Sequence, residues 1–97
     1  MNIATIHVRL KLAEAGSLKD KRSIGKRLMA ALKSQFQVSV AEVGDQDNRG
    51  FFTVGMALVT SSQEVAQNTL QRIGDFLYED PRFSNVEMEE DLYAAYD

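Results

Sequence analysis

The residues from 3 to 12 alternate between an apolar and a largely polar set, and this alternation limits the fold more than any other feature of the chain. Successive residues of a β-strand point to opposite faces of a sheet, so a two-residue period predicts a strand with one buried face. The apolar set is Ala4, Ile6, Val8, Leu10 and Leu12. The opposite set is Ile3, Thr5, His7, Arg9 and Lys11. We therefore expect a sheet that is covered on one face and open on the other.

The period changes to that of a helix after Ser17. At about 100° per residue the apolar side chains fall on one side of a helix over 18–35. They are Leu18, Ile24, Leu28, Ala31, Leu32 and Phe36. The Ser17 hydroxyl can accept a hydrogen bond from the backbone of Asp20, which marks the start of this helix. Gly25 in its interior costs about 0.5 to 1 kcal/mol of helix propensity, so we expect another element to pack closely against it.

The rest of the chain supplies three strands and a second helix. Strands are predicted at 38–43 and 51–60, joined by a hairpin through the turn-forming residues 44–50. A second helix begins at a capping box over 61–64 and ends before Asp80-Pro81. A last strand is predicted at 86–89, and the acidic tail that follows it has no predicted structure.

This order of elements predicts one α+β architecture. Strand, helix, strand, strand, helix, strand with right-handed crossovers is the ferredoxin-like βαββαβ sandwich, a four-stranded antiparallel sheet with two helices on one face. The first and third strands would be central, and the last would lie beside the first. With 97 residues, we expect a single ferredoxin-like domain over 1–97.

Composition excludes several classes of protein. Cysteine is absent, which removes disulfides, thiolate nucleophiles and sulfur-ligated metals and favours the cytoplasm. No apolar run approaches the roughly 20 residues that cross a bilayer, and residues 1–5 do not resemble a leader. We therefore expect a soluble protein without a membrane partner.

Charge is divided unevenly along the chain. Residues 1–33 carry eight lysines and arginines against two acids, a net charge of +6, whereas residues 34–97 carry three against twelve, a net charge of -9. Most of the excess lies on the first predicted helix, where Lys19, Arg22, Lys26 and Lys33 share a sector of about 60°. Lys21 and Arg27 are expected to flank this row on either side. Such a row can follow a phosphate backbone, although an ordinary solvated helix face has the same pattern.

The open face of the predicted sheet is a second candidate surface. Its apolar half would carry Phe51, Ala57, Val59, Ala41 and Val43. An apolar patch of this kind suits a homodimer interface, a small ligand or a protein partner, or nucleic-acid bases stacked on Phe51. Dimerisation is the stronger of these interpretations, because one aromatic ring makes a poor stacking platform.

Catalytic patterns are weak. His7 is the only histidine, and a lone histidine on a polar strand face is more often a surface residue than a catalyst. Glu42, Asp45 and Asp47 could supply oxygen ligands for magnesium, but a polar hairpin loop has the same composition, so we expect no metal and no cofactor. The loop over 13–16 lacks the arginine with which acylphosphatases of this fold hold phosphate. A phosphate-ester hydrolase is therefore the third and weakest hypothesis.

Two segments resemble a known family. Residues 17–22 (SLKDKR) and 38–43 (VSVAEV), the latter followed by Gln46-Asp47, resemble the YlxP-like family, a bacterial domain of unknown function. Gly55 and residues 59–61 also lie at the expected intervals. The resemblance implies a ferredoxin-like fold and, through the family's usual gene neighbourhood, a role near the ribosome. The chain departs from the family at 48–50, where Asn-Arg-Gly replaces a Leu-Trp-Gln-type stretch.

The sequence thus favours a non-enzymatic, RNA- or ribosome-associated accessory protein whose first helix contacts phosphates. The alternative is a dimeric regulatory or interaction module that uses the open sheet face.

Overall fold

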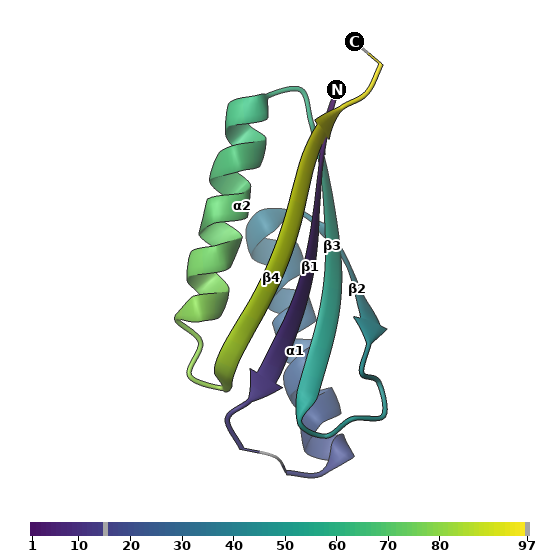
Figure 1. Ribbon diagram of the computed structural model, residues 1–97, viewed down its shortest axis with the longest axis vertical. Helices are drawn as coiled ribbons and strands as arrows, with labels where there is room; N and C mark the ends of the chain where they lie inside the picture. Colours follow the sequence, from purple (N-terminus) through teal and green to yellow (C-terminus); the bar gives the residue numbers. More distant parts are fainter. Residues whose placement is uncertain (15, 97) are drawn as a thin grey trace.

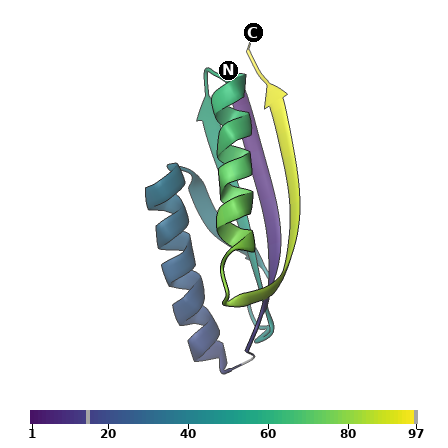
Figure 2. The same cartoon turned by 90° about the vertical axis from the view of Figure 1, so that its left-hand side faces the viewer.

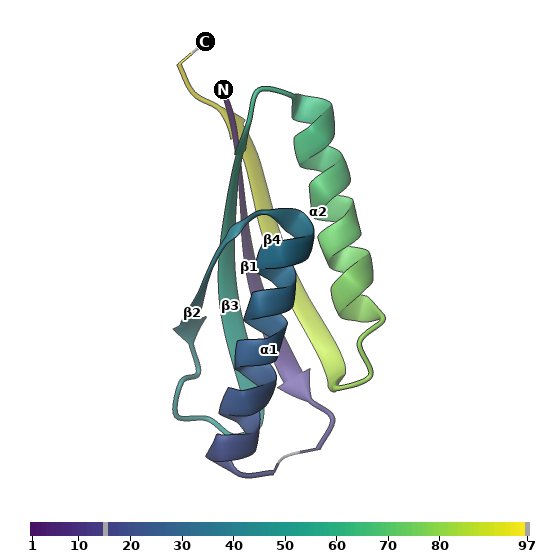
Figure 3. The same cartoon turned by 180° about the vertical axis from the view of Figure 1, so that it is seen from behind.

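The computed structural model describes residues 1–14 and 16–96, and Ala15 and Asp97 lie outside it. Six elements follow one another along the chain. They are β1 (Asn2–Leu12), α1 (Leu18–Phe36), β2 (Ser39–Gly44), β3 (Phe51–Thr60), α2 (Gln63–Tyr78) and β4 (Phe83–Ala94). The strands form one antiparallel sheet in the order β2-β3-β1-β4, and Figure 3 shows both helices on the same face of it. The predicted βαββαβ sandwich is confirmed.

The two-residue period of β1 places the core as expected. Its apolar set faces the helices and is almost completely buried, and it packs with apolar residues of α1, α2 and β3. β1 pairs with β3 on one side and with β4 on the other, so it is central as predicted. The helix-free side, called the open face below, is turned toward the viewer in Figure 1.

Local signals at both helix starts are largely confirmed. The Ser17 hydroxyl accepts from the backbone nitrogen of Asp20 at 3.1 Å, and the Asp20 carboxylate accepts from the Ser17 nitrogen in return. The start of α2 differs from the prediction by one residue. Ser62, not Ser61, is the cap, and its hydroxyl accepts from the Val65 nitrogen at 3.2 Å.

Gly25 lies where another element packs closely, as expected. A β-carbon at this position would lie 2.6 Å from Cε1 of Phe52, a core residue of β3. The missing side chain therefore lets α1 approach the sheet, which offsets the propensity that glycine costs.

The C-terminal tail is the largest departure from the sequence prediction. β4 runs for 12 residues and pairs with the whole length of β1, from Asn2 opposite Ala94 to Leu12 opposite Phe83. Among the acids that obscured the pattern, Glu87, Glu89 and Asp91 lie on the open face of this edge strand, where charge is tolerated. Glu90 lies opposite Ile6 on the helix face, at the exposed margin beside α2. No helix among the residues described here is long and apolar enough to cross a membrane.

Candidate nucleic-acid interface

The basic row of α1, defined as Lys19, Arg22, Lys26 and Lys33, faces solvent. All four side chains are exposed, and none has a carboxylate within ion-pair distance among residues 1–14 and 16–96. Three of them surround a shallow hollow of about 370 Å³ on the helix surface, with Ser23 as the remaining lining residue. This surface therefore presents unpaired positive charge to any approaching anion.

Arg27 lies beside the row and is also exposed. Its Nη2 donates to the Ser23 hydroxyl at 3.0 Å, one turn back along the helix. It also borders a second hollow, of about 300 Å³, together with Arg49 from the loop between β2 and β3. Arg27 thus lies on the solvent side of α1, and its predicted role as a secondary contact stays a prediction.

Lys21 has to be removed from the predicted contacts. Its side chain is 1% exposed, and Nζ donates to the backbone oxygen of Asp45 and lies 3.8 Å from a carboxylate oxygen of Glu42. The flanking position assigned from sequence was wrong. At 100° per residue Lys21 falls in the same sector as Leu28, seven residues later, which is on the apolar stripe.

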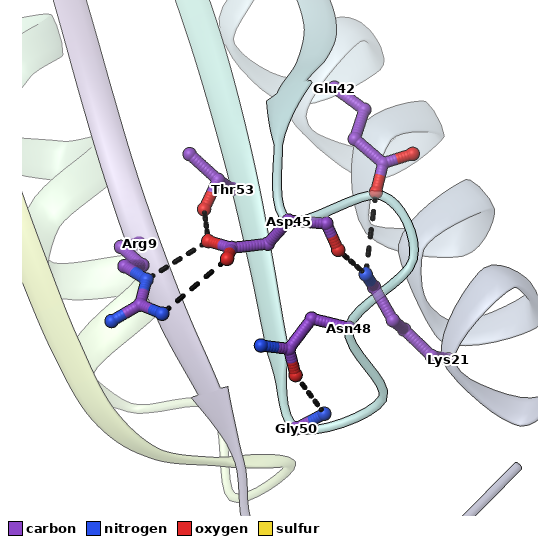
Figure 4. Close-up of polar contacts among 7 residues, drawn as sticks. All are labelled: Arg9, Lys21, Glu42, Asp45, Asn48, Gly50 and Thr53. Carbon is purple, nitrogen blue, oxygen red and sulfur yellow. Dashed lines mark hydrogen bonds and ion pairs between the residues drawn. The ribbon is translucent and has the colours of Figure 1, made fainter. Parts of the chain in front are cut away.

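Asp45 connects this buried lysine with the open face. Figure 4 shows its backbone oxygen toward Lys21 and its carboxylate toward Arg9 on β1. The carboxylate accepts from Arg9 Nε at 2.9 Å and from the Thr53 hydroxyl. These bonds, that from Arg9 first, hold the pKa of Asp45 below its ordinary value, and the same contact raises the pKa of Arg9. The backbone of Asp45 is left-handed, with φ 56°.

This network was missed from the sequence. It joins residues 36 positions apart, which come together because β1 and β2 both pair with β3. Two members of this network, Glu42 and Asp45, are among the residues considered as magnesium ligands in the sequence analysis. Their side chains contact Lys21 and Arg9 instead, and no group of three or more metal-ligating side chains occurs in the described part of the chain.

The open face carries the predicted apolar residues, but not all are equally accessible. Val43 and Val59 are 51% and 61% exposed, and Ala41 and Ala57 are exposed as well. Phe51 is half-buried, because the Arg9 guanidinium lies 3.7 Å from the centre of its ring. That cation–π contact covers one face of the ring, so a base that stacked on this face would have to displace Arg9.

Tyr93 extends this face, and the sequence prediction did not place it. It lies opposite Ile3, which is in turn opposite Val59, so the three side chains form one row across β4, β1 and β3. Tyr93 is 50% exposed. Its position could not be read from the sequence, because the strand assignment had stopped at residue 89.

These features define an α+β protein of the ferredoxin-like class with an exposed basic helix. Residues 3–90 match the family described as a protein of unknown function, DUF503, and the chain belongs to that family. It is 39% identical over 64 residues to the uncharacterized protein YlxP of Bacillus subtilis (strain 168), an alignment that covers 66% of this chain and 70% of YlxP. The predicted resemblance to YlxP-like proteins is confirmed.

Solved structures agree on the fold alone. A de novo designed protein, Foldit4, superposes with a TM-score of 0.63 at 14% identity, covering 98% of both chains. A designed protein with a ferredoxin fold, LFR1 1, gives a TM-score of 0.55 at 14% identity over all of this chain and 89% of its own. SnoaB, a cofactor-independent oxygenase from Streptomyces nogalater, gives 0.53 at 15% identity, covering 100% and 96%.

Proposed function

We propose that this protein binds the phosphate backbone of structured RNA through the basic row of α1 and acts by binding, not by catalysis. The observation that carries the proposal is the row itself, four exposed cations without a carboxylate partner in the described residues of a chain with net charge -3. Cations spaced along a helix neutralise successive phosphates and release their counterions. The partner that the family resemblance suggests is an RNA-containing particle, a ribosomal subunit, in the cytoplasm.

The arrangement of the other polar groups agrees with a binding role. Lys21, which is buried, and Arg9, which is half-buried, are already paired inside the fold and hold the loop between β2 and β3. Phosphate contacts position a partner without reading its sequence. Selectivity would then come from the shape of the RNA against α1 and the neighbouring Arg49, which is also exposed.

The test compares two variants with the same change of net charge. Arg22→Gln plus Lys26→Gln removes two positive charges from the row. Gln67→Glu plus Asn68→Glu adds two negative charges on exposed positions of α2. Binding to a structured RNA is measured by fluorescence anisotropy at about 50 and 200 mM salt.

We expect the first variant to weaken binding and to reduce the slope of log K against log salt by about two, one for each lost contact. The second variant should leave the slope unchanged. Equal effects of both variants would show that only net charge matters and would contradict a defined interface. Sedimentation of each variant with ribosomal subunits checks the proposed partner in the same way.

The open face supports a second candidate, a dimeric interaction module. Its motivating observation is the exposure of Val43 and Val59, with Tyr93 in the same row as Val59. We propose Val59→Glu as the test and Val65→Glu on α2, 50% exposed, as its matched control. Sedimentation equilibrium at micromolar concentration should show a dimer that only Val59→Glu dissociates. A wild-type monomer would exclude this candidate.

A further inference from the structure

No strand among residues 1–14 and 16–96 pairs with the outer edge of β4, which is 12 residues long. β4 is the last strand in the sheet order, and its described pairing is with β1. Figure 2 looks toward this side of the molecule, where β4 and α2 run side by side and no further strand lies outside β4. An edge of this kind leaves backbone donors and acceptors free, and proteins use such edges to bind an extended peptide as an additional strand.

Each side of this edge has its own chemistry. On the open face, Glu87, Glu89 and Asp91 alternate along β4 and are exposed. None of the three is in an ion pair with another residue in the part of the chain that the structure describes. They form a column of negative charge along the edge.

On the helix face, a groove of about 400 Å³ separates β4 from α2. Leu70, Tyr78 and Met88 provide apolar surface in it. Its remaining side chains are polar: Gln67, Gln71, Asp75 and Glu90. The absence of a side chain at Gly74 keeps the groove open, since a β-carbon there would lie 3.9 Å from the Met88 sulfur. A strand added to β4 would place every second side chain over this groove.

The inner edge of β4 already shows what kind of strand fits. β1 places Arg9 opposite Glu87 and His7 opposite Glu89, and between them Val8 lies opposite Met88 on the helix face. A strand at the outer edge would meet the same β4 side chains from the other side. Its matching sequence is one in which basic residues alternate with apolar residues, because opposite charges across strands stabilise pairing.

A second copy of β4 is a poor occupant for this edge. Antiparallel pairing of two such strands about their centres would bring the acids of 87–91 opposite one another, and like charges directly opposite are destabilising. The same carboxylates attract a positively charged strand. Charge complementarity at the outer edge of β4 therefore favours a basic strand from another protein. The open face, by contrast, is the candidate interface for a second copy of this chain.

We propose that the outer edge of β4 binds an extended segment of another protein, in which lysine or arginine alternates with apolar residues, by adding it to the sheet as a fifth strand. The basic residues would lie beside Glu87, Glu89 and Asp91. The apolar residues would cover the groove between β4 and α2. This surface is separate from the basic row of α1, so the proposal does not depend on RNA binding.

The test is an NMR titration of the full-length ¹⁵N-labelled protein with a synthetic peptide that copies residues 3–12, the strand whose pattern fits β4. A second peptide carries glutamate in place of His7, Arg9 and Lys11. A third has the composition of the first but groups the basic residues together, so that the alternation is lost. We expect the first peptide alone to shift amide signals of residues 83–94 and of the α2 residues that line the groove.

Two charge variants locate the contact. Glu87→Gln plus Glu89→Gln should raise the Kd of the first peptide roughly 2- to 30-fold, as expected for two lost cross-strand charge pairs. Asp47→Lys makes the same change of net charge at an exposed position of the loop between β2 and β3, which does not line the groove, and should leave the Kd unchanged.

Several outcomes would overturn the proposal. Equal binding of the grouped peptide would show diffuse charge attraction without strand addition. Signal changes confined to the open face or to α1 would place the peptide elsewhere. No shift of β4 amides at millimolar peptide, or self-association of the free protein through β4, would show an edge that is merely protected by its charges or is occupied by a second copy.

Discussion

Replacing Gly25 by alanine measures how closely α1 is packed against the sheet. Alanine is favoured over glycine in a helix interior by about 1 kcal/mol. The backbone of Gly25 can accept alanine without strain, because no glycine of the described residues has a positive φ. A steric clash with Phe52 opposes this gain in helix propensity. The added β-carbon would lie 2.6 and 3.0 Å from two ring carbons of Phe52, whereas carbon atoms pack at about 3.5 to 4.0 Å.

The ring of Phe52 has little room to move, since it is 2% exposed and belongs to the core. Forcing extra volume into a packed core costs about 1 to 3 kcal/mol. Subtracting the propensity gain leaves a net loss of about 1 kcal/mol, within a range of roughly 0 to 2. For a domain of this length, 1 kcal/mol lowers the Tm by about 4 to 8 °C.

Gly74 is the matched control for this substitution. It is also a buried glycine inside a helix, but its added β-carbon would contact Met88 at 3.9 Å, an ordinary van der Waals distance. Gly74→Ala should therefore keep the propensity gain and stabilise the protein by about 0.5 to 1 kcal/mol. The two variants are predicted to shift the Tm in opposite directions.

Thermal and urea denaturation, followed by circular dichroism, measure the free energy of unfolding of each variant. Equal m-values for wild type and variants would show that all unfold in the same two-state transition, so that their free energies can be compared. A double-mutant cycle adds Phe52→Leu. The smaller side chain should cost less stability in the Gly25→Ala background than in the wild type, because it relieves the same contact. If Gly25→Ala and Gly74→Ala stabilise the protein equally, the close approach of α1 to Phe52 is wrong.

Three further predictions concern polar contacts. Lys21→Met should reduce the free energy of unfolding by about 2 kcal/mol in urea denaturation, because it removes a charged hydrogen bond to a backbone oxygen. Lys33 is exposed, so Lys33→Met should change the free energy of unfolding by less than about 0.5 kcal/mol. Similar values for both variants would contradict the burial of Lys21. The hydrogen bond from Arg9 lowers the pKa of Asp45 in the folded state. The Asp45 carboxylate therefore stabilises the fold at any pH above its pKa in the unfolded chain, which is about 4. This stabilisation is lost as the pH falls through the lower pKa of the folded state. Asp45→Asn should make the free energy of unfolding less dependent on pH below about 4, and an unchanged acid profile would refute the linkage. Ser17→Ala should cost about 1 kcal/mol through loss of the helix cap, measured as a lower Tm; an unchanged Tm would show that the cap contributes nothing.

Periodicity determined the order of elements and the buried faces from the sequence. Strand and helix periods are local properties of five to twenty residues, and here they agree with the turn and capping residues between them. The same local signals placed Ser17 at the start of α1 and the four cations of the basic row on its solvent side. The close packing at Gly25 was also predicted from the sequence, because a glycine inside a helix costs stability unless another element lies too near for a side chain.

Only the tertiary structure decided which charged residues pair and how far the last strand extends. Lys21 is buried because β2 and its following loop lie over that part of α1 and supply Glu42 and the backbone oxygen of Asp45. The end of β4 at Ala94 follows from the full length of β1 beside it, which pairs with residues whose own pattern is obscured by charge. Both outcomes depend on contacts between distant segments, and a pattern within one segment carries no information about what another segment places against it.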